Sequence, residues 1–435
     1  MQRPPGPQGG FAVGNGLTYD ADRLGFLATA CREFGDLWAY DRTVYVAAGA
    51  ELSRAVLNRT TYEFGVPPGF FPPPRRPRHA PPPDVERVWV HAARMRGLRP
   101  AEVRRRLAPL AEESAALAES WPSGGSVEVL PRVREALSRI GARFLFGVDA
   151  EELVHGEREL FRLRETFNTQ LVRLPHWVPA PTTLRIRRQQ AVLGRRVRAV
   201  LRRRRADGAD EPDVLGAMMR PSSQYGLLAD DTVVGALVGL MIAGHEVPTR
   251  ALGWILFTLA GHPGAQERIA AEAACLPDDP GETAVAHLDA LEFTTAFVRE
   301  VLRVHPPTWL LARTVVQGTE LGGYPLCPGM RVMVSPYLLH HDGRYHPEPD
   351  RFDPGRWLPG TTTVDTARRD HGYLPFGTGP RACDGAALAL TELVLVTAHL
   401  MRRHHLTVPS PTPYRLDTNG GLTPVGLTLT TEPRR

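Results

Sequence analysis

Most of the chain carries apolar residues at helical spacing, and only a few short runs alternate between apolar and polar positions. The alternating runs, typical of strands, are 37–40 with 44–46, 313–319 with 330–335, and a hairpin-like stretch at 414–430 that turns at Gly420-Gly421. The segments with a helical pattern are the first part of 18–58, before the short strands of that stretch, and 84–98, 101–119, 130–146, 157–173, 183–205, 263–274 and 289–304. The pattern therefore predicts a protein that is mainly α with a minor antiparallel β portion.

The longest apolar stretch, 232–260, contains the ionisable pair His245 and Glu246 near its centre. Only about ten uncharged residues precede this pair, whereas a helix that spans a bilayer needs about 20. We therefore predict a long central helix buried in the core, and no membrane anchor. Because burying a charge is costly unless the charge is paired or used, the pair also marks this helix as a candidate functional element.

Two proline-rich segments interrupt the helices. The segment 65–83 is nearly half proline, so it cannot form a helix or a central strand, and we predict a long irregular loop. Its Phe70 and Phe71 favour the wall of a cavity over a linker between domains. A second break at 174–181 contains Trp177, for which ordinary packing is an equal alternative.

Composition limits the classes of protein that remain. The 435 residues are 43% hydrophobic and 23% charged, with no internal repeat and no polar linker, which favours one globular domain over 1–435, its first 15 residues poorly ordered. The four cysteines are scattered, so we expect no disulfide framework and a reducing, cytoplasmic location. All 52 basic residues are arginine, and the clusters at 104–106 and 202–205 lack interleaved aromatics, so helix ends in solvent are favoured over nucleic-acid binding.

One cysteine lies in a loop with a specific pattern. The segment 376–385 reads Phe-Gly-Thr-Gly-Pro-Arg-Ala-Cys-Asp-Gly, and an apolar run follows at once. Glycines permit a tight loop, which would present Cys383 beside a helix N-terminus, where backbone N–H groups and the helix dipole favour a thiolate. A buried free cysteine is the alternative for an isolated loop of this kind.

The spacing Phe-x-x-Gly-x-Arg-x-Cys-x-Gly resembles the haem-binding loop of the cytochrome P-450 family, and three further elements support the resemblance. Glu300 and Arg303 resemble the family's Glu-x-x-Arg pair, and Arg356 lies in a segment similar to its Pro-x-Arg-(Phe/Trp) motif. The segment 243–246 resembles the family's oxygen-binding groove. The resemblance implies a cytochrome P-450 fold, a single triangular α+β domain, in which Glu300, Arg303 and Arg356 form a structural network.

The resemblance also implies haem b with Cys383 as the axial thiolate ligand of the iron. Haem carries two propionates, which require cations. The family positions that bind the cofactor correspond to Phe376, Gly377, Arg381, Cys383 and Gly385 in the loop, to Arg313 in a predicted strand, and, by an inexact match, to Arg87 and His91. Asp384, directly after the ligand, is unusual: it would either lower the iron potential or lie solvated on the surface.

The predicted groove departs from the family pattern at one position. The family usually has a threonine whose hydroxyl takes part in proton delivery, and this chain has Val247 there, in a catalytic segment that includes Ala243, Gly244 and Glu246. Valine makes no hydrogen bond, and Thr249 lies about 200° further around the helix. Pro248 has no N–H and so frees the carbonyl of Gly244. The hypothesis is that this carbonyl, with Glu246, holds a water that replaces the hydroxyl.

The remaining inferences concern substrate and partners. By family position the pocket is lined mainly by apolar residues, which favours a hydrophobic terpenoid or polyketide-like substrate: Phe70, Phe71, Trp177, Leu240, Thr308, Trp309, Leu310 and Leu422. The chain has no flavin or nicotinamide fingerprint, so electrons from NAD(P)H would arrive through a reductase and a ferredoxin that docks on an arginine-rich face with Arg94, Arg96 and Arg99. The leading function is a bacterial monooxygenase, expected as a monomer. Alternatives are oxidative coupling, desaturation, rearrangement or peroxide use, and a haem-binding protein without catalysis.

Overall fold

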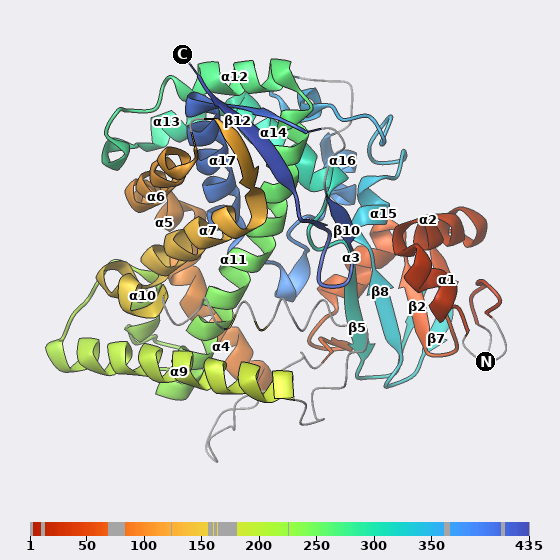
Figure 1. Ribbon diagram of the computed structural model, residues 1–435. Coiled ribbons are helices and arrows are strands. Elements are labelled where there is room, and N and C mark those ends of the chain that lie inside the picture. The colour runs from red at the N-terminus through yellow and green to blue at the C-terminus, as the bar shows by residue number, and fades with distance from the viewer. Residues whose placement is uncertain are drawn as a thin grey trace. The chain divides into compact units, whose positions relative to one another are not determined.

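The computed structural model describes residues 3–9, 14–67, 83–122, 124–154, 160, 163, 181–224, 226–360, 366–409 and 414–434 (Figure 1). By internal packing the chain divides into two compact units, each made of two segments. The first unit is Met1–Pro68 with Arg299–Cys383, and the second is Gly69–Val298 with Asp384–Arg435. Each unit is described separately below.

The first unit is built on a five-stranded sheet with the order β1-β2-β8-β5-β3. All neighbouring strands are antiparallel except β2 and β8, which are parallel. Apolar side chains from these strands and from the helix α3 form its core. The elements are α1 (Gly16–Ala21), α2 (Arg23–Phe34), β1 (Leu37–Ala39), β2 (Val44–Ala47), α3 (Ala50–Asn58), β3 (Phe64–Gly65), β5 (Leu311–Val315), β6 (Thr319–Leu321), β7 (Tyr324–Leu326), β8 (Arg331–Val334), α15 (Pro336–His340), η3 (Pro354–Trp357), α16 (Thr366–Gly372) and η4 (Gly379–Arg381).

The edge strand β1 is covered by the segment before it. The backbone N–H of Ala39 donates to the Pro5 carbonyl at 2.8 Å, and Pro4 is buried. A Cβ at position 6 would lie 2.0 Å from the Ala39 oxygen, so only glycine permits this approach. Residues 3–9, part of the stretch expected to be poorly ordered, thus protect an otherwise open sheet edge.

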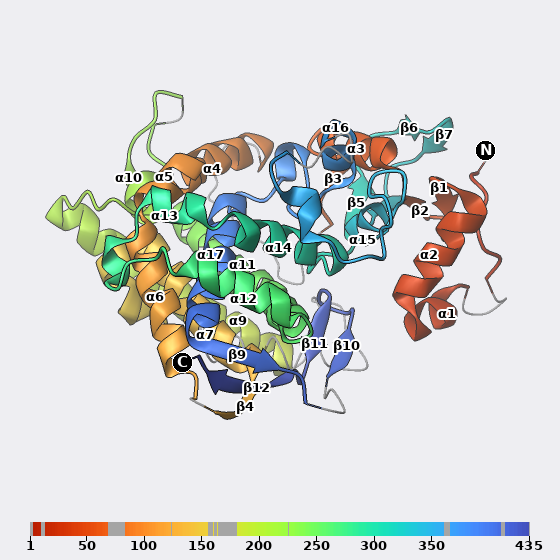
Figure 2. The same cartoon turned by 90° about the horizontal axis from the view of Figure 1, so that it is seen from above.

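The second unit is mainly helical. Its longest helix, α11 (Asp230–Ala260), packs against α7 (Val129–Phe146), α9 (Pro181–Asp207) and α17 (Ala386–Arg403) (Figure 1). Two small antiparallel sheets accompany the helices, one with the order β4-β12-β9 and one formed by β10 and β11 (Figure 2). The other elements are α4 (Pro83–Leu98), α5 (Pro100–Arg105), α6 (Leu107–Ser120), β4 (Gly125–Glu128), η1 (Gly147–Asp149), α10 (Val214–Met219), α12 (Pro263–Ala273), η2 (Pro280–Glu282), α13 (Val285–Ala290), β9 (His404–Thr407), β10 (Arg415–Asp417), β11 (Thr423–Val425) and β12 (Thr428–Pro433).

The helix α14 (Glu292–Val304) begins in the second unit and ends in the first. Its start is fixed by Glu272 of α12, whose two carboxylate oxygens accept the N–H groups of Phe293 and Thr294 at 2.6 and 2.8 Å. These are helix N-terminal donors that have no partner within the helix. The last turns of α14 carry Glu300 and Arg303.

The predicted class, mainly α with a minor antiparallel β portion, is confirmed. The alternating runs form β5 paired with β8, and the hairpin at 414–430 is present as β10 and β11. The predicted central helix is α11. By length and composition alone α11 would also suit a membrane span, but the same test is passed by core helices, and 44% of its most apolar window is buried within the protein.

Candidate cofactor site

The cysteine loop is held in shape by backbone hydrogen bonds and by two glycines. The N–H of Cys383 donates to the Phe376 carbonyl at 2.9 Å, which closes the loop. Gly377 and Gly379 have φ of 69° and 75°, a region that favours glycine. A Cβ on Gly379 would also lie 2.5 Å from the Leu57 oxygen. The loop therefore presents the exposed Cys383 from a rigid backbone, three residues before α17 begins.

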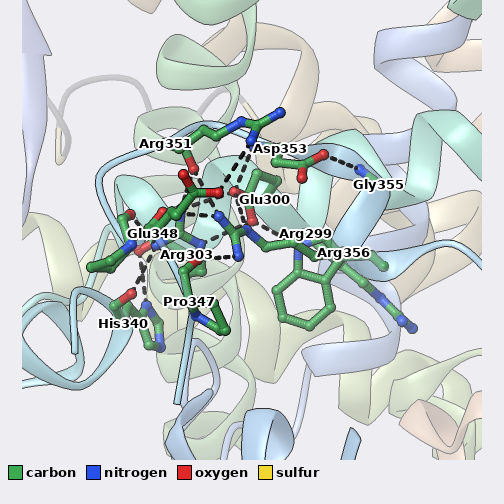
Figure 3. A network of polar contacts seen from close by, with 12 residues as sticks. Arg299, Glu300, Arg303, His340, Pro347, Glu348, Arg351, Asp353, Gly355 and Arg356 are labelled. Carbon is green, nitrogen blue, oxygen red and sulfur yellow. Dashed lines mark hydrogen bonds and ion pairs between the residues drawn. The ribbon is translucent and has the colours of Figure 1, made fainter. Parts of the chain in front are cut away.

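A buried carboxylate, that of Glu300, supports the segment before this loop (Figure 3). Its Oε1 accepts from Arg303 at 2.8 Å, from Arg356 at 3.2 Å and from the backbone of Asp353 at 2.9 Å. Its Oε2 accepts from Arg303 at 2.9 Å and from the indole N–H of Trp357 at 2.8 Å. Burial alone would raise the pKa of Glu300, but the hydrogen bonds and charge of Arg303 outweigh burial and lower it. The structure thus brings Glu300, Arg303 and Arg356 together in the expected network.

The two guanidiniums also hold the irregular segment 340–351 by its backbone carbonyls. Their remaining N–H groups are directed at these oxygens, as Figure 3 shows for His340 and Pro347. Arg303 donates to the carbonyls of His340, Pro349 and Arg351 at 2.8, 2.7 and 3.1 Å, and Arg356 donates to those of Pro347, Glu348 and Arg351 at 2.6, 2.9 and 3.2 Å. A segment without regular structure must satisfy its carbonyls elsewhere, and here two arginines do so.

A histidine that sequence analysis missed connects this network to the cysteine loop. His340 is completely buried, and its Nε2 accepts the N–H of Leu374 at 2.9 Å, two residues before Phe376. Its Nδ1 must then carry the proton that is donated to the Arg303 carbonyl at 3.0 Å. Burial lowers the pKa of His340 well below its usual value, which keeps the ring neutral. No spacing signal in the sequence identifies a histidine whose partners are backbone atoms.

Two arginines of the first unit are suited to an anionic cofactor. Arg313 is 5% exposed and donates to the Thr60 hydroxyl and the Ala312 carbonyl, each at 3.0 Å. Burial and the positive charge of Arg381 lower the pKa of Arg313, and no described carboxylate pairs with it. A buried cation beside a second cation requires an anion. The propionates of a haem would satisfy this requirement, so the donor set of Cys383, Arg313 and Arg381 fits the predicted cofactor.

The helix α11 supplies the predicted groove in the second unit. Ala243 is exposed, Gly244, Glu246 and Val247 are partly exposed, and a Cβ on Gly244 would meet nothing within 4 Å. This face of the helix therefore borders open space. Thr249 is only 2% exposed, and its hydroxyl accepts and donates no hydrogen bond among the described residues. Thr249 is packed in the interior and does not take the place of the missing threonine hydroxyl.

The helix α4 carries the other two predicted propionate ligands. Arg87 and His91 lie one turn apart, and both are exposed. The Nδ1 of His91 lies 2.7 Å from one oxygen of Asp384, and Arg94 donates to the other oxygen at 3.3 Å. Asp384 is therefore not the solvated surface charge that was one of the two expectations for it. Arg94 is correspondingly engaged within the chain, and Arg96 donates to the carbonyls of Arg220 and Pro221.

The residues predicted to line a substrate pocket fall into three groups. Phe70, Phe71 and Trp177 lie outside the residues that the structure describes. Leu240, Thr308 and Leu310 are partly exposed. Trp309 and Leu422 are 4% and 2% exposed and are part of the packed interior, where the Leu422 carbonyl accepts the indole N–H of Trp254 at 3.0 Å.

Comparisons with known proteins agree with this geometry. A family model described as Cytochrome P450 matches residues 136–432. Two proteins of Streptomyces melanosporofaciens are similar: cyclooctat-9-en-7-ol 5-monooxygenase is 31% identical over 75% of this chain and 73% of its own, and cyclooctatin synthase is 30% identical over 98% and 95%. Pentalenene oxygenase of Streptomyces avermitilis is 28% identical over 74% of this chain and 70% of its own. The structure described as retinoic acid bound cyanobacterial CYP120A1 aligns over 100% of both chains with a TM-score of 0.79 and 21% identity, which confirms the fold.

Proposed function

The chain belongs to the cytochrome P450 family, and from this premise we propose that it is a haem-thiolate monooxygenase that transfers one oxygen atom from O2 to a hydrophobic, terpenoid-like substrate. The observation that carries the proposal is the exposed thiol of Cys383 on a loop whose supports, Glu300, Arg303 and Arg356, are all in place. Oxidoreductase chemistry of the monooxygenase type follows from the family. The terpenoid-like substrate and the source of electrons do not follow from the family and are proposed here for this chain.

We assign the cofactor contacts to residues of this chain as follows. In the first unit, Cys383 would bind the haem iron, and Arg313 and Arg381 would hold the propionates. His91 is a candidate propionate donor by its family position. A haem with a thiolate ligand supplies oxidation of unactivated C–H bonds with O2 and two electrons. Phe376, Gly377 and Gly385 shape the loop, and Arg87 is a further candidate donor on α4.

We propose that proton delivery uses the segment 243–248 of α11. Pro248 lacks an N–H, so the Gly244 carbonyl has lost its partner four residues ahead in the helix. The open space beside Gly244 leaves room for a water at this carbonyl, and we assign Glu246 as the group that would exchange a proton with it. Val247 would then only fill space where a threonine is usual.

The substrate class is inferred from two observations. The relatives named above act, by their names, on cyclooctat-9-en-7-ol and pentalenene, an unsaturated alcohol and an alkene. The partly exposed candidates Leu240 and Leu310 are apolar, and Thr308 is the one polar side chain among the described partly exposed candidates. This favours a substrate that is mostly hydrocarbon with few polar groups.

Electrons would come from NAD(P)H through a reductase and a ferredoxin. The docking face needs arginines that are not already used within the chain. Arg94 and Arg96 bind Asp384 and backbone carbonyls, respectively, which leaves Arg99, exposed at the start of α5, as the remaining candidate of the three.

The first experiment is the difference spectrum of the reduced protein with carbon monoxide, followed by turnover with a ferredoxin, its reductase and a panel of terpene hydrocarbons and alcohols. The expected result is the band typical of thiolate ligation and formation of a hydroxylated product. The matched control is Cys327→Ala, which removes another exposed thiol. A thiolate-type band that persists in Cys383→Ala would refute the ligand assignment.

A second candidate function is favoured by Val247. Without the usual threonine, desaturation, coupling, rearrangement or direct use of peroxide is a real alternative to oxygen insertion. Product analysis by mass distinguishes them, because insertion adds one oxygen atom and desaturation removes two hydrogens. The Val247→Thr variant then tests proton delivery: because the proposed carbonyl-bound water already replaces the hydroxyl, coupling of NADH to product should equal that of the wild type, whereas a marked rise in coupling would show that proton delivery is limited by the missing hydroxyl.

A further inference from the structure

The residue that follows the predicted iron ligand is unusually well anchored. Asp384 directly follows Cys383, and its side chain is only 15% exposed. Both carboxylate oxygens are used, one by the Nδ1 of His91 at 2.7 Å and the other by a guanidinium nitrogen of Arg94 at 3.3 Å. The two partners lie on α4, some 290 residues earlier in the chain.

Arg94 extends this contact to a third helix. Its second terminal nitrogen donates to the Ala236 carbonyl of α11 at 3.1 Å. A Cβ on Gly239, one turn further along α11, would lie 3.8 Å from the same nitrogen, so the guanidinium lies directly against this helix. Burial lowers the pKa of Arg94, and the charge of Asp384 counteracts that effect. A largely buried guanidinium of this kind depends on its carboxylate partner.

We propose that Asp384 is a positioning residue that fixes the start of α17, and with it the adjacent Cys383, to α4 and α11 through His91 and Arg94. The cysteine is then held on both sides: its own N–H is bound to the Phe376 carbonyl, and the next residue is bound to two side chains of α4, one of which, Arg94, also binds α11. The proposal rests on the proposed function, in which Cys383 binds the haem iron.

The same contact orients His91. A carboxylate only accepts, so the Nδ1 directed at Asp384 carries a proton, and the imidazolium form of His91 has a second N–H, at Nε2, to donate to a propionate. A single carboxylate thus orders both a predicted propionate ligand and the thiolate residue. An exposed ion pair without such a role would contribute little, because exposed pairs are screened by solvent. The ion pair of Arg104 with Asp289, at 2.6 Å between α5 and α13 and with both side chains more than a third exposed, is a pair of that kind in this chain.

The experiment compares four variants of the haem-loaded full-length protein: Asp384→Leu, Asp384→Asn, Arg94→Met and the double variant Asp384→Leu with Arg94→Met. Three quantities are measured. They are the haem bound per chain, the fraction of the reduced carbon monoxide complex that shows the thiolate-type band, and the half-life of that band on warming. The melting temperature of the haem-free protein reports folding separately. Asp289→Leu is the matched control, because it removes the same chemistry from an exposed helix–helix ion pair.

The expected result for Asp384→Leu is a half-life of the thiolate-type band about tenfold shorter than that of the wild type, equivalent to about 1.4 kcal/mol. Asp384→Asn keeps an oxygen that accepts from Arg94, and its amide N–H can donate to Nδ1 of the neutral His91 tautomer that carries its proton on Nε2, so it should recover most of this loss. The double variant should lose little more than either single variant, because both remove one contact. Asp289→Leu should leave the band unchanged.

Two outcomes would overturn the proposal. One is an Asp384→Leu protein with the wild-type half-life of the band. The other is a loss in Asp289→Leu as large as that in Asp384→Leu, which would indicate general destabilisation. Failure of the proposed function looks different, because the wild-type protein itself would then bind no haem or show no thiolate-type band.

Discussion

Glu300 of the first unit and Glu392 of the second are both buried glutamates on long helices, but their surroundings are opposite. Glu300 is fully buried and accepts five hydrogen bonds, three of them from arginine side chains. Glu392 of α17 is 1% exposed, and its Oε2 accepts no hydrogen bond from the described residues. The pKa of Glu300 is lowered, whereas burial raises the pKa of Glu392 well above its usual value.

The difference shows that burial alone does not decide the charge of a carboxyl group. Glu300 stays ionised because guanidinium groups compensate its burial, and in return it holds two arginines that bind the segment before the cysteine loop. Glu392 avoids the cost of an uncompensated buried charge by keeping its proton. Glu300 is therefore the charged centre of a hydrogen-bond network, whereas Glu392 is a neutral polar group buried on α17.

The strongest test of this contrast is Glu300→Ala. Removing the carboxylate leaves Arg303 and Arg356 buried without their anion, and loss of one partner of a buried pair costs about 3–5 kcal/mol. We expect the free energy of unfolding to fall by that amount in urea titrations, and haem retention to fall with it. A loss below about 1 kcal/mol would mean that the backbone carbonyls alone compensate the two arginines.

Arg356→Lys should have the next largest effect. Lysine keeps the charge but cannot donate to Glu300 and to the carbonyls of Pro347, Glu348 and Arg351 at once. Hydrogen bonds to charged groups contribute about 1.5–3 kcal/mol each, and we expect a total loss of about 2–3 kcal/mol after rearrangement. Exposed Arg351, whose side chain pairs only with exposed Glu348 among the described residues, provides the control as Arg351→Lys, with an expected loss near zero.

The charged residues of the network around Glu300 were predictable from the sequence, whereas the contacts that connect this network to the cysteine loop were not. Glu300, Arg303 and Arg356 lie in motifs with fixed spacing that resemble those of the cytochrome P-450 family, and this resemblance identified them. The role of His340 depends on the backbone atoms of Arg303 and Leu374 and on packing between distant segments, which leave no periodic signal. The same limit applies to Asp384, because its partners His91 and Arg94 precede it by some 290 residues.

Acid should affect the first unit through its buried histidines. Burial, together with the positive charge of Arg303, lowers the pKa of His346 from 6.5 to about 4, whereas the unfolded chain binds the proton near 6.5. The unfolded state therefore binds more protons between these values, so stability is complete above pH 6.5 and is lost as the pH falls toward about 4. One pKa unit corresponds to about 1.4 kcal/mol, so the fall from 6.5 to about 4 corresponds to a contribution of about 3 kcal/mol.

The measurement is the melting temperature of wild type and His346→Phe from pH 7 to pH 4. The ring lies among Trp357, Tyr373 and His340, so phenylalanine is a suitable replacement. The variant should lose less stability on acidification than the wild type. Parallel curves for the two proteins would assign the acid sensitivity to other histidines whose pKa is lowered by burial, such as His340 and His305.

Glu392→Gln should have the smallest effect on the free energy of unfolding. It should raise this free energy, whereas Glu300→Ala should lower it. Because the folded pKa of Glu392 is raised, the folded protein keeps a proton that the unfolded chain releases above about pH 4.5, and stability therefore falls as the pH rises. Glutamine has nearly the same shape and no proton to release. The variant should be more stable than the wild type at neutral pH by about 1 kcal/mol or more, and the gain should disappear near pH 4.5.

Urea titrations at pH 5 and pH 8 measure this difference in stability. The control is Glu272→Gln, which should show no such gain because the Glu272 carboxylate binds helix N–H groups. A Glu392→Gln protein that is less stable than the wild type at both pH values would show that the carboxyl group makes a contact that favours its native form, and the contrast with Glu300 would then be one of degree.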